Sequence, residues 1–145
     1  IDKILSFIKS EFPECDRIVL IFFEIEGQAQ KKISILKLKY KELFEFINKI
    51  PLDEYLEHRI RFYHFPLCTI PVRFFKFTWR TLPKSDICFL SKCKNCDLAE
   101  LCLGIPRNYL ALFGNSEFEP VKLGDLRIKK TKNWYPPIEK INKII

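Results

Sequence analysis

Apolar and charged positions alternate in the first 66 residues with two different periods, which predict two helix–strand pairs. Apolar side chains at helical spacing predict a helix over 4–12, which Pro13 ends. The continuous apolar run 18–23 is typical of a strand buried on both faces, as in a parallel sheet. A second amphipathic pattern predicts a helix over 40–50, and the run 60–65 predicts a second strand.

The order helix, strand, helix, strand predicts parallel strands joined by right-handed crossovers. The expected fold class is therefore α/β, a partial (β/α) barrel or a parallel-sheet layer, followed by a small cysteine-rich cluster-binding region. We expect α/β units over 1–66, the cluster-binding region over 67–121 and a basic tail over 122–145. Two parallel strands do not complete a sheet, and the sequence contains no Met, so we expect a piece of a longer protein.

The region after residue 66 has a weaker pattern. The aromatic stretch 74–79 suits either a short strand or a packed helix, and 107–113 predicts a short helix that ends at Gly114. The net charge of +7 is uneven, because the tail from Lys122 carries +5 and the preceding residues only +2. The body is therefore close to neutral, which weakens the argument for nucleic acid as a partner.

Cysteine usage is the most informative part of the composition. The chain has no 18-residue apolar run and does not begin with an export-signal pattern, so we expect a cytoplasmic protein without a membrane span. In a reducing compartment, six clustered cysteines bind metal more often than they form disulfides.

The spacing of Cys93, Cys96 and Cys102 predicts three ligands of one metal centre. Cys68 and Cys88 are the candidates for the fourth ligand, and a four-thiolate set suits a structural zinc or an iron–sulfur cluster. Zinc sites usually contain two closely spaced pairs, whereas this chain has one, which favours a cluster. Buried cysteines without a ligand are the remaining explanation. Cys15 stands alone and is expected to be a surface or loop thiol.

Three segments give the chain a resemblance to a known family. Cys93, Cys96 and Cys102 match the C-x2-C-x5-C part of the SPASM signature. Residues 23–30 are similar to the Gly-x-Ala turn after a late barrel strand, and 63–71 to a segment whose Pro-Leu-Cys supplies a cluster cysteine. Together these segments resemble the C-terminal portion of a radical SAM enzyme with a SPASM-like auxiliary cluster region, in particular the His-Xaa-Ser system maturases.

The resemblance implies an auxiliary 4Fe-4S cluster held by Cys68 and the three spaced cysteines, and a role in peptide or protein modification. It also implies that Gly27 and Glu26 contact S-adenosyl-L-methionine. A second cluster would belong to an N-terminal radical SAM half, in the same or a partner chain, because the C-x3-C-x2-C triad is not in these 145 residues. Such a chain is not expected to be active alone. Pro106 stands where SPASM proteins carry a further cysteine, so one auxiliary cluster is implied rather than two.

Other candidate residues have simpler explanations. His64 is expected to be a hydrogen-bonded core residue and His58 to face solvent, while Glu24 and Glu26 are candidates for positioning a ligand at the end of a buried strand. The cationic and aromatic side chains Arg73, Lys76, Trp79 and Arg80 are also typical of nucleic-acid readers. The alternative function is therefore a zinc-stabilised module that binds RNA or a protein partner through the Trp79/Arg80 region and the basic tail.

Overall fold

The computed structural model describes residues 1–124 and contains helices and strands in alternation. The strands are β1 (Ile18–Ile21), β2 (Ile60–Tyr63), β3 (Thr78–Trp79), β4 (Ile87–Cys88) and β5 (Ile105–Pro106). The α-helices are α1 (Asp2–Glu11), α2 (Gly27–Lys31), α3 (Tyr40–Asn48), α4 (Glu54–Arg59) and α5 (Arg107–Phe113). The 3-10 helices are η1 (Leu67–Thr69), η2 (Val72–Phe77), η3 (Lys84–Asp86) and η4 (Ser91–Asn95).

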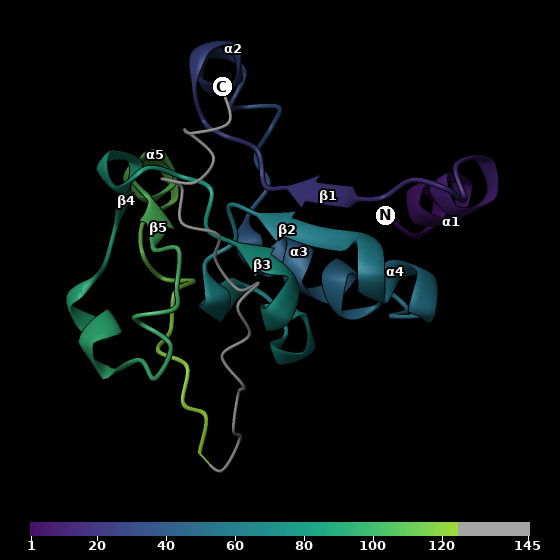
Figure 1. Cartoon of the computed structure of the whole chain (residues 1–145). Helices are drawn as coiled ribbons and strands as arrows, with labels where there is room; N and C mark the ends of the chain where they lie inside the picture. Colours follow the sequence, from purple (N-terminus) through teal and green to yellow (C-terminus); the bar gives the residue numbers. More distant parts are fainter. Residues whose placement is uncertain (125–145) are drawn as a thin grey trace.

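A three-stranded parallel sheet organises the first part of the chain, with the order β1-β2-β3 (Figure 1). Both predicted helix–strand pairs are confirmed, because α1, β1, α3 and β2 follow one another where the pattern placed them. The third strand lies within the aromatic stretch 74–79, for which a short strand and a packed helix were both expected alternatives. The aromatic stretch 74–79 is divided between η2 and β3, so it is both helix and strand. Among the described residues the sheet is open and does not close into a barrel.

Only one face of this sheet is buried, and the prediction that the first strand is buried on both faces is wrong. Ile18, Ile60, Phe62 and Thr78 are at most 5% exposed, whereas Ile21 at the end of β1 is 58% exposed. The buried residues alternate along β2 with half-buried ones, as expected when one face packs on helices and the other does not. The strand is also shorter than predicted and ends at Ile21 rather than residue 23.

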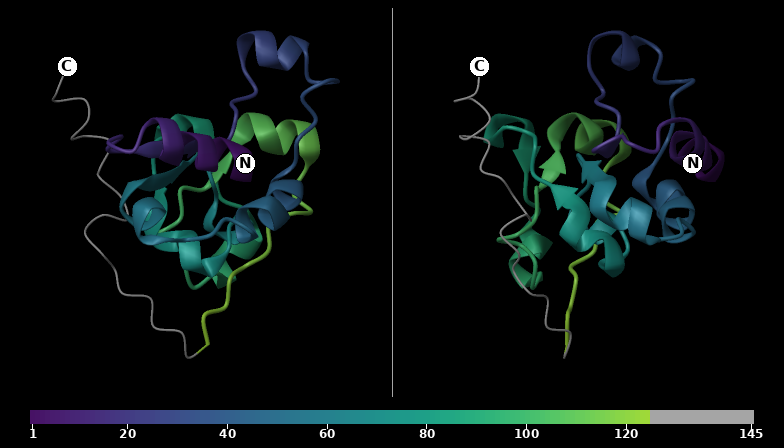
Figure 2. Two further views of the ribbon diagram at one scale, coloured as in Figure 1. Left: turned by 90° about the vertical axis from the view of Figure 1, so that its right-hand side faces the viewer. Right: turned by 45° about the vertical axis from the view of Figure 1, so that its right-hand side comes forward.

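Local sequence explains where the helices begin and end. The Asp53 side chain accepts a hydrogen bond from the Leu56 amide and caps the N-terminus of α4. At α5 the predicted glycine end is confirmed, since Gly114 follows the helix with φ of +72°, a value that glycine adopts without strain. Helix α2 has no buried residue and stands away from the rest of the molecule in all views (Figure 2).

One hydrophobic core joins the sheet to the cysteine-rich region. It contains Ile60 and Phe62 from the sheet and also Leu98, Tyr109 and Phe118 from beyond residue 90. Strands β4 and β5 form a small antiparallel pair beside α5 (Figure 1). No helix within residues 1–124 is long and apolar enough to cross a bilayer. From residue 125 onward, the predicted basic tail lies outside the described residues.

Candidate metal centre and adjoining pocket

Cys68, Cys93, Cys96 and Cys102 line a single cavity. The cavity holds about 390 Å³ of empty space, counted with its opening to solvent. Its walls are otherwise almost entirely apolar side chains and backbone; the one charged residue among them is Glu119. The four cysteines that spacing and resemblance selected are therefore brought to one place, although Cys68 is 25 positions from the nearest of the others in sequence.

A series of tight turns presents three of these thiols to the cavity. The Cys93 amide donates to the Leu90 carbonyl at 2.9 Å, and the Cys96 amide donates to the Cys93 carbonyl at 3.0 Å. The Cys102 amide then donates to the Leu98 carbonyl at 2.9 Å. Each turn reverses the chain within a few residues, so sulfurs separated by two and five residues reach the same cavity. The fourth thiol, Cys68, comes from η1.

Backbone amides donate hydrogen bonds to two of the sulfurs. The amides of Leu67 and Gly104 each lie 3.4 Å from Sγ of Cys102, and the amide of Val121 lies 3.4 Å from Sγ of Cys96. Such donors stabilise the thiolate form of cysteine, which is the form that binds metal. The same kind of donor adjusts the reduction potential of iron–sulfur clusters.

The electrostatic environment keeps the metal-free thiols of Cys68 and Cys102 protonated. Burial, with smaller effects in the same direction from the neighbouring thiols of Cys102, Cys96 and Cys93, raises the pKa of Cys68 to about 12. Burial also raises the pKa of Cys102, against the effect of its two amide donors. A metal that binds here must therefore displace protons, so its affinity increases with pH.

The four sulfurs do not converge on one point. Within residues 1–124, no group of three or more His, Cys, Asp or Glu side chains is arranged to hold a metal ion. A single zinc ion needs all four sulfurs at about 2.3 Å from one centre. In a four-iron cluster each cysteine binds a different iron, so the sulfurs stand further apart around a larger group. Four thiols in an apolar cavity are a donor set that an iron–sulfur cluster or a structural zinc can use.

The other two cysteines lie elsewhere. Cys88, the alternative fourth ligand, is on β4 and is not part of the cavity lining; its sulfur lies 3.6 Å from the Ile105 carbonyl oxygen. Cys15 is in the loop before β1, half-buried, with its sulfur 3.2 Å from the hydroxyl of Tyr55. The geometry thus favours Cys68 over Cys88.

Gly104 is a part of the site that sequence reasoning missed. Its φ is +94°, and a Cβ atom there would lie 3.1 Å from Ile87 and 3.2 Å from the Cys88 carbonyl oxygen. Glycine is therefore required both by the backbone conformation and by the close packing of β4. The only signal in the sequence is a glycine two positions after the last cysteine of the motif.

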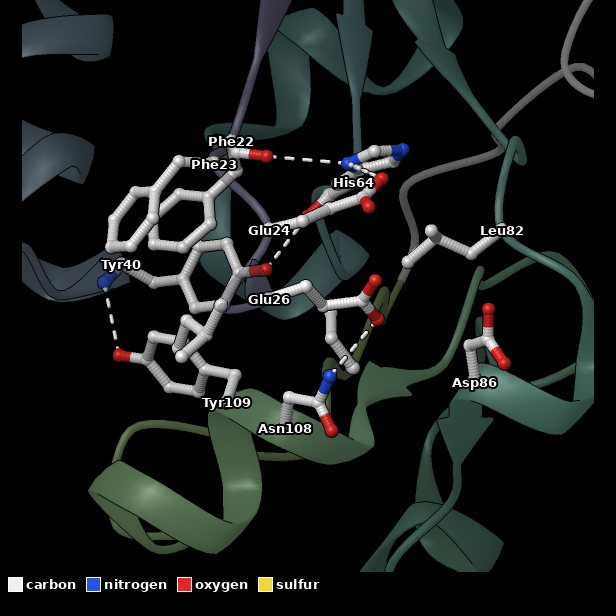
Figure 3. Close-up of a pocket in the computed structure, with 12 residues that line it drawn as sticks. Phe22, Phe23, Glu24, Glu26, Tyr40, His64, Leu82, Asp86, Asn108 and Tyr109 are labelled. Carbon is white, nitrogen blue, oxygen red and sulfur yellow. Dashed lines mark hydrogen bonds and ion pairs between the residues drawn. The ribbon is translucent and has the colours of Figure 1, made fainter. Parts of the chain in front are cut away.

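A second cavity lies where β1 and β2 end, as Figure 3 shows. Glu24, Glu26 and Asp86 line it together with His64 and several aromatic side chains. Glu24 and Glu26, the two candidates at the end of the first strand, therefore line the same cavity. Asn108 of α5 donates to Glu26 at 3.1 Å. The carboxyl ends of parallel strands are the usual place for ligands in α/β proteins, because the loops that follow them leave a crevice.

His64 is a buried, hydrogen-bonded residue, as predicted, and it fixes the shape of this pocket. It is 8% exposed, and its Nδ1 lies 3.2 Å from the Phe22 carbonyl oxygen and 3.4 Å from Glu24. Its φ of +66° is unusual for a residue with a side chain. The hydroxyl of Tyr40 donates to its carbonyl at 2.7 Å and holds this conformation. His58 is exposed, also as predicted.

Gly27 and Glu26 lie at the N-terminus of α2, on the border of the pocket. Gly27 has φ of +52°, so a turn that favours glycine is present, but nothing lies within 4 Å of a Cβ built there. Both residues line a second, more open hollow that shares Ile25, Glu26 and Asn108 with the first. The space beside Gly27 therefore leaves room for a ligand next to the backbone.

Tyr40 lies between the pocket at the strand ends and a surface hollow beside Cys68. Its ring stacks on Phe22, with centroids 3.9 Å apart, and it lines both the acidic pocket and a surface hollow that includes Cys68. Burial raises the pKa of Tyr40 well above its ordinary value, with smaller effects in the same direction from Tyr109 and Cys68. The phenol therefore stays protonated and remains a hydrogen-bond donor.

The cationic residues of 73–80 do not present their charges to a common ligand. Arg73 donates to the carbonyls of Asn48 and Ile50, Lys76 pairs with Glu57, and Arg80 donates to the Glu100 carbonyl. These contacts are within the chain and stabilise the fold.

Comparison of the chain with protein-family models, with curated proteins and with solved structures finds no match. The function therefore has to be argued from the two cavities.

Proposed function

We propose that this chain is the auxiliary-cluster-bearing C-terminal part of a radical SAM enzyme that acts in peptide or protein modification. The observation that carries the proposal is the convergence of Cys68, Cys93, Cys96 and Cys102 on one apolar cavity, with amide donors to two of the sulfurs. The resemblance to SPASM-type maturases selected the same four residues.

The proposed ligands are these four thiolates, and the bound cluster would supply one-electron chemistry or a contact point for the substrate. The chain's own residues have separate tasks. The apolar lining keeps water away from the sulfurs, and the amides of Leu67, Gly104 and Val121 stabilise their negative charge. Cys68 has to lose its proton when the metal binds, because its thiol is neutral beforehand.

The sheet supports the barrel part of the proposal. The helices that connect β1, β2 and β3 leave one face of the sheet buried and the other open, which is the arrangement of a segment of a (β/α) barrel. In this proposal the remaining strands and the C-x3-C-x2-C triad belong to the radical SAM half. Glu26 and Gly27 border the crevice at the carboxyl ends of the strands, where S-adenosyl-L-methionine and the substrate would meet.

Metal analysis of the full chain tests the cluster. After anaerobic reconstitution with iron and sulfide, we expect about four irons per chain and the broad sulfur-to-iron charge-transfer absorption of a cluster. Single Cys→Ser changes at positions 68, 93, 96 and 102 should each lower the iron content, whereas Cys15→Ser and Cys88→Ser should not. Loss of iron in Cys88→Ser but not in Cys68→Ser would show that the fourth ligand is wrong.

A colourless protein with one zinc per chain would overturn the cluster and favour the zinc-stabilised binding module instead. The radical SAM assignment has its own test. The chain alone should not cleave S-adenosyl-L-methionine, and a polypeptide with the C-x3-C-x2-C triad, encoded upstream in the same gene or separately, should bind it and restore cleavage. If neither the gene nor its neighbours encode such a polypeptide, the assignment fails.

A further inference from the structure

One face of the three-stranded sheet is only partly covered by the rest of the described chain. We call it the open face; it consists of Val19, Ile21, Arg61, Tyr63 and Trp79, in register across the strands. Ile21 is 58% exposed, whereas Phe62 on the opposite face is fully buried. Parallel sheets are covered on both faces in folded proteins, because their strands present apolar side chains to both sides. Within residues 1–124 the open face is only partly covered, since Ile21 is exposed and its other four residues are half-buried.

Two arginines at the open face are not compensated by acids. The guanidinium of Arg17 lies 5.5 Å, and that of Arg61 5.6 Å, from the ring centroid of Trp79. Arg61 donates to the carbonyls of Ile60 and His58. In the described part of the chain neither arginine forms an ion pair with a carboxylate. Arg61 is half-buried and Arg17 is exposed, and an anionic partner would stabilise these two neighbouring like charges.

We propose that the open face docks against a protein surface that is apolar opposite Val19 and Ile21 and carries a carboxylate opposite Arg17 and Arg61. The apolar positions require a hydrophobic cover, and the arginine pair sets the charge of the group beside it. This inference does not depend on the metal centre, since none of these residues lines the thiol cavity.

Two other occupants fit the face less well. A nucleic acid would need a free aromatic ring for stacking, but Trp79 already has both arginines over its ring and Tyr63 stacked beside it at 6.1 Å. A second copy of this chain in a two-fold contact would bring two arginine pairs into one interface, in a protein whose net charge is already +7.

A pair of matched peptides tests the proposal. The probe is a labelled amphipathic helical peptide with a leucine stripe flanked by glutamates, and its twin has glutamine at every glutamate position. At low salt the full chain should bind the acidic peptide at least tenfold more tightly, as expected for charge-assisted hydrogen bonds worth about 1.5–3 kcal/mol. Fluorescence anisotropy measures both affinities.

Variants locate the binding. Arg17→Gln combined with Arg61→Gln should abolish the preference for the acidic peptide, and Ile21→Ser should weaken both peptides. The control, Lys3→Gln combined with Lys31→Gln, removes the same charge at a distance from the open face and should leave both affinities unchanged. Since Arg17 is exposed, Arg17→Gln alone keeps the test valid if the double variant does not fold.

Three results would overturn the proposal. The first is equal binding of the two peptides, or equal losses in the arginine and lysine variants. The second is tighter binding of oligouridylate than of the acidic peptide, lost in the arginine variant, which would assign the face to nucleic acid. The third is a concentration-dependent dimer that Ile21→Ser dissociates, which would make a second copy the occupant.

Discussion

Replacing Gly104 with alanine should destabilise the chain more than the same change at any other described glycine. An alanine there has to adopt φ near +94°, and its Cβ would lie 3.1–3.2 Å from Ile87, Phe89 and the carbonyl oxygen of Cys88. The left-handed conformation costs about 1–2 kcal/mol. The contacts cost about 1–3 kcal/mol more, because a backbone atom is among them and cannot move aside cheaply. We expect a total loss of about 2–5 kcal/mol.

Gly114→Ala is the matched control. Gly114 also has a positive φ, of +72°, but nothing lies within 4 Å of a Cβ built at that position. Its replacement should therefore cost only the conformational part, about 1–2 kcal/mol. The difference between the two variants isolates the close packing of Gly104 against β4, beside the thiol cavity.

Urea unfolding of the metal-free chain under reducing conditions measures both values. Far-UV circular dichroism and tryptophan fluorescence should give coincident transitions, with the midpoint of Gly104→Ala lower than that of Gly114→Ala by on the order of 1 M. Equal midpoints would refute the reasoning, since they would mean that β4 moves away from residue 104 without cost.

Three further predictions concern other parts of the chain. Burial raises the pKa of Cys68 from 9.0 to about 12, so the folded state binds this proton more tightly than the unfolded state does. The free energy of unfolding therefore falls as the pH rises above 9. Urea titrations of the metal-free protein should show a smaller loss of stability between pH 9 and pH 10.5 for Cys68→Ala than for the unchanged chain. Asp53→Ala should cost about 0.5–2 kcal/mol of unfolding free energy through the lost cap of α4, and Asp53→Asn much less, because asparagine still caps. Truncation after Val121 should leave the iron content unchanged, since the Val121 amide that donates to Cys96 is kept; a loss of iron or of helical circular dichroism would show that later residues complete the core.

Patterns of short range in the sequence predicted the helices and the first two strands well. The segments 4–12 and 40–50 have a strong helical period and a proline behind them, and the structure places α1 and α3 there. The sequence left strand and helix open for 74–79, because Thr78 and Trp79 are too few for a period to be visible. Burial on both sides of β1 was inferred from apolar composition, but what covers a strand depends on chain that its own residues do not specify.

In the candidate site too, some residues could be predicted from local sequence, whereas others required the tertiary structure. Spacing found Cys93, Cys96 and Cys102, because the turns that present them are local. The choice between Cys68 and Cys88 needed the fold, since both are remote from the motif and only the packing of η1 and β4 decides which thiol faces the cavity. The sequence places Tyr40 only at the start of the helix predicted over 40–50, because its position between the pocket and the surface hollow follows from tertiary contacts alone.

The thiol cavity is closed by the last part of the described chain. Phe118, Glu119 and Pro120 form one of its walls, the Val121 amide donates to Cys96, and the Val121 carbonyl accepts from the amide of Asp97. During synthesis, the residues up to 113 emerge from the ribosome before this wall. All four cysteines are therefore available while the cavity is still open on one side, and the order of synthesis leaves an interval in which the proposed cluster would be inserted before the chain closes over it.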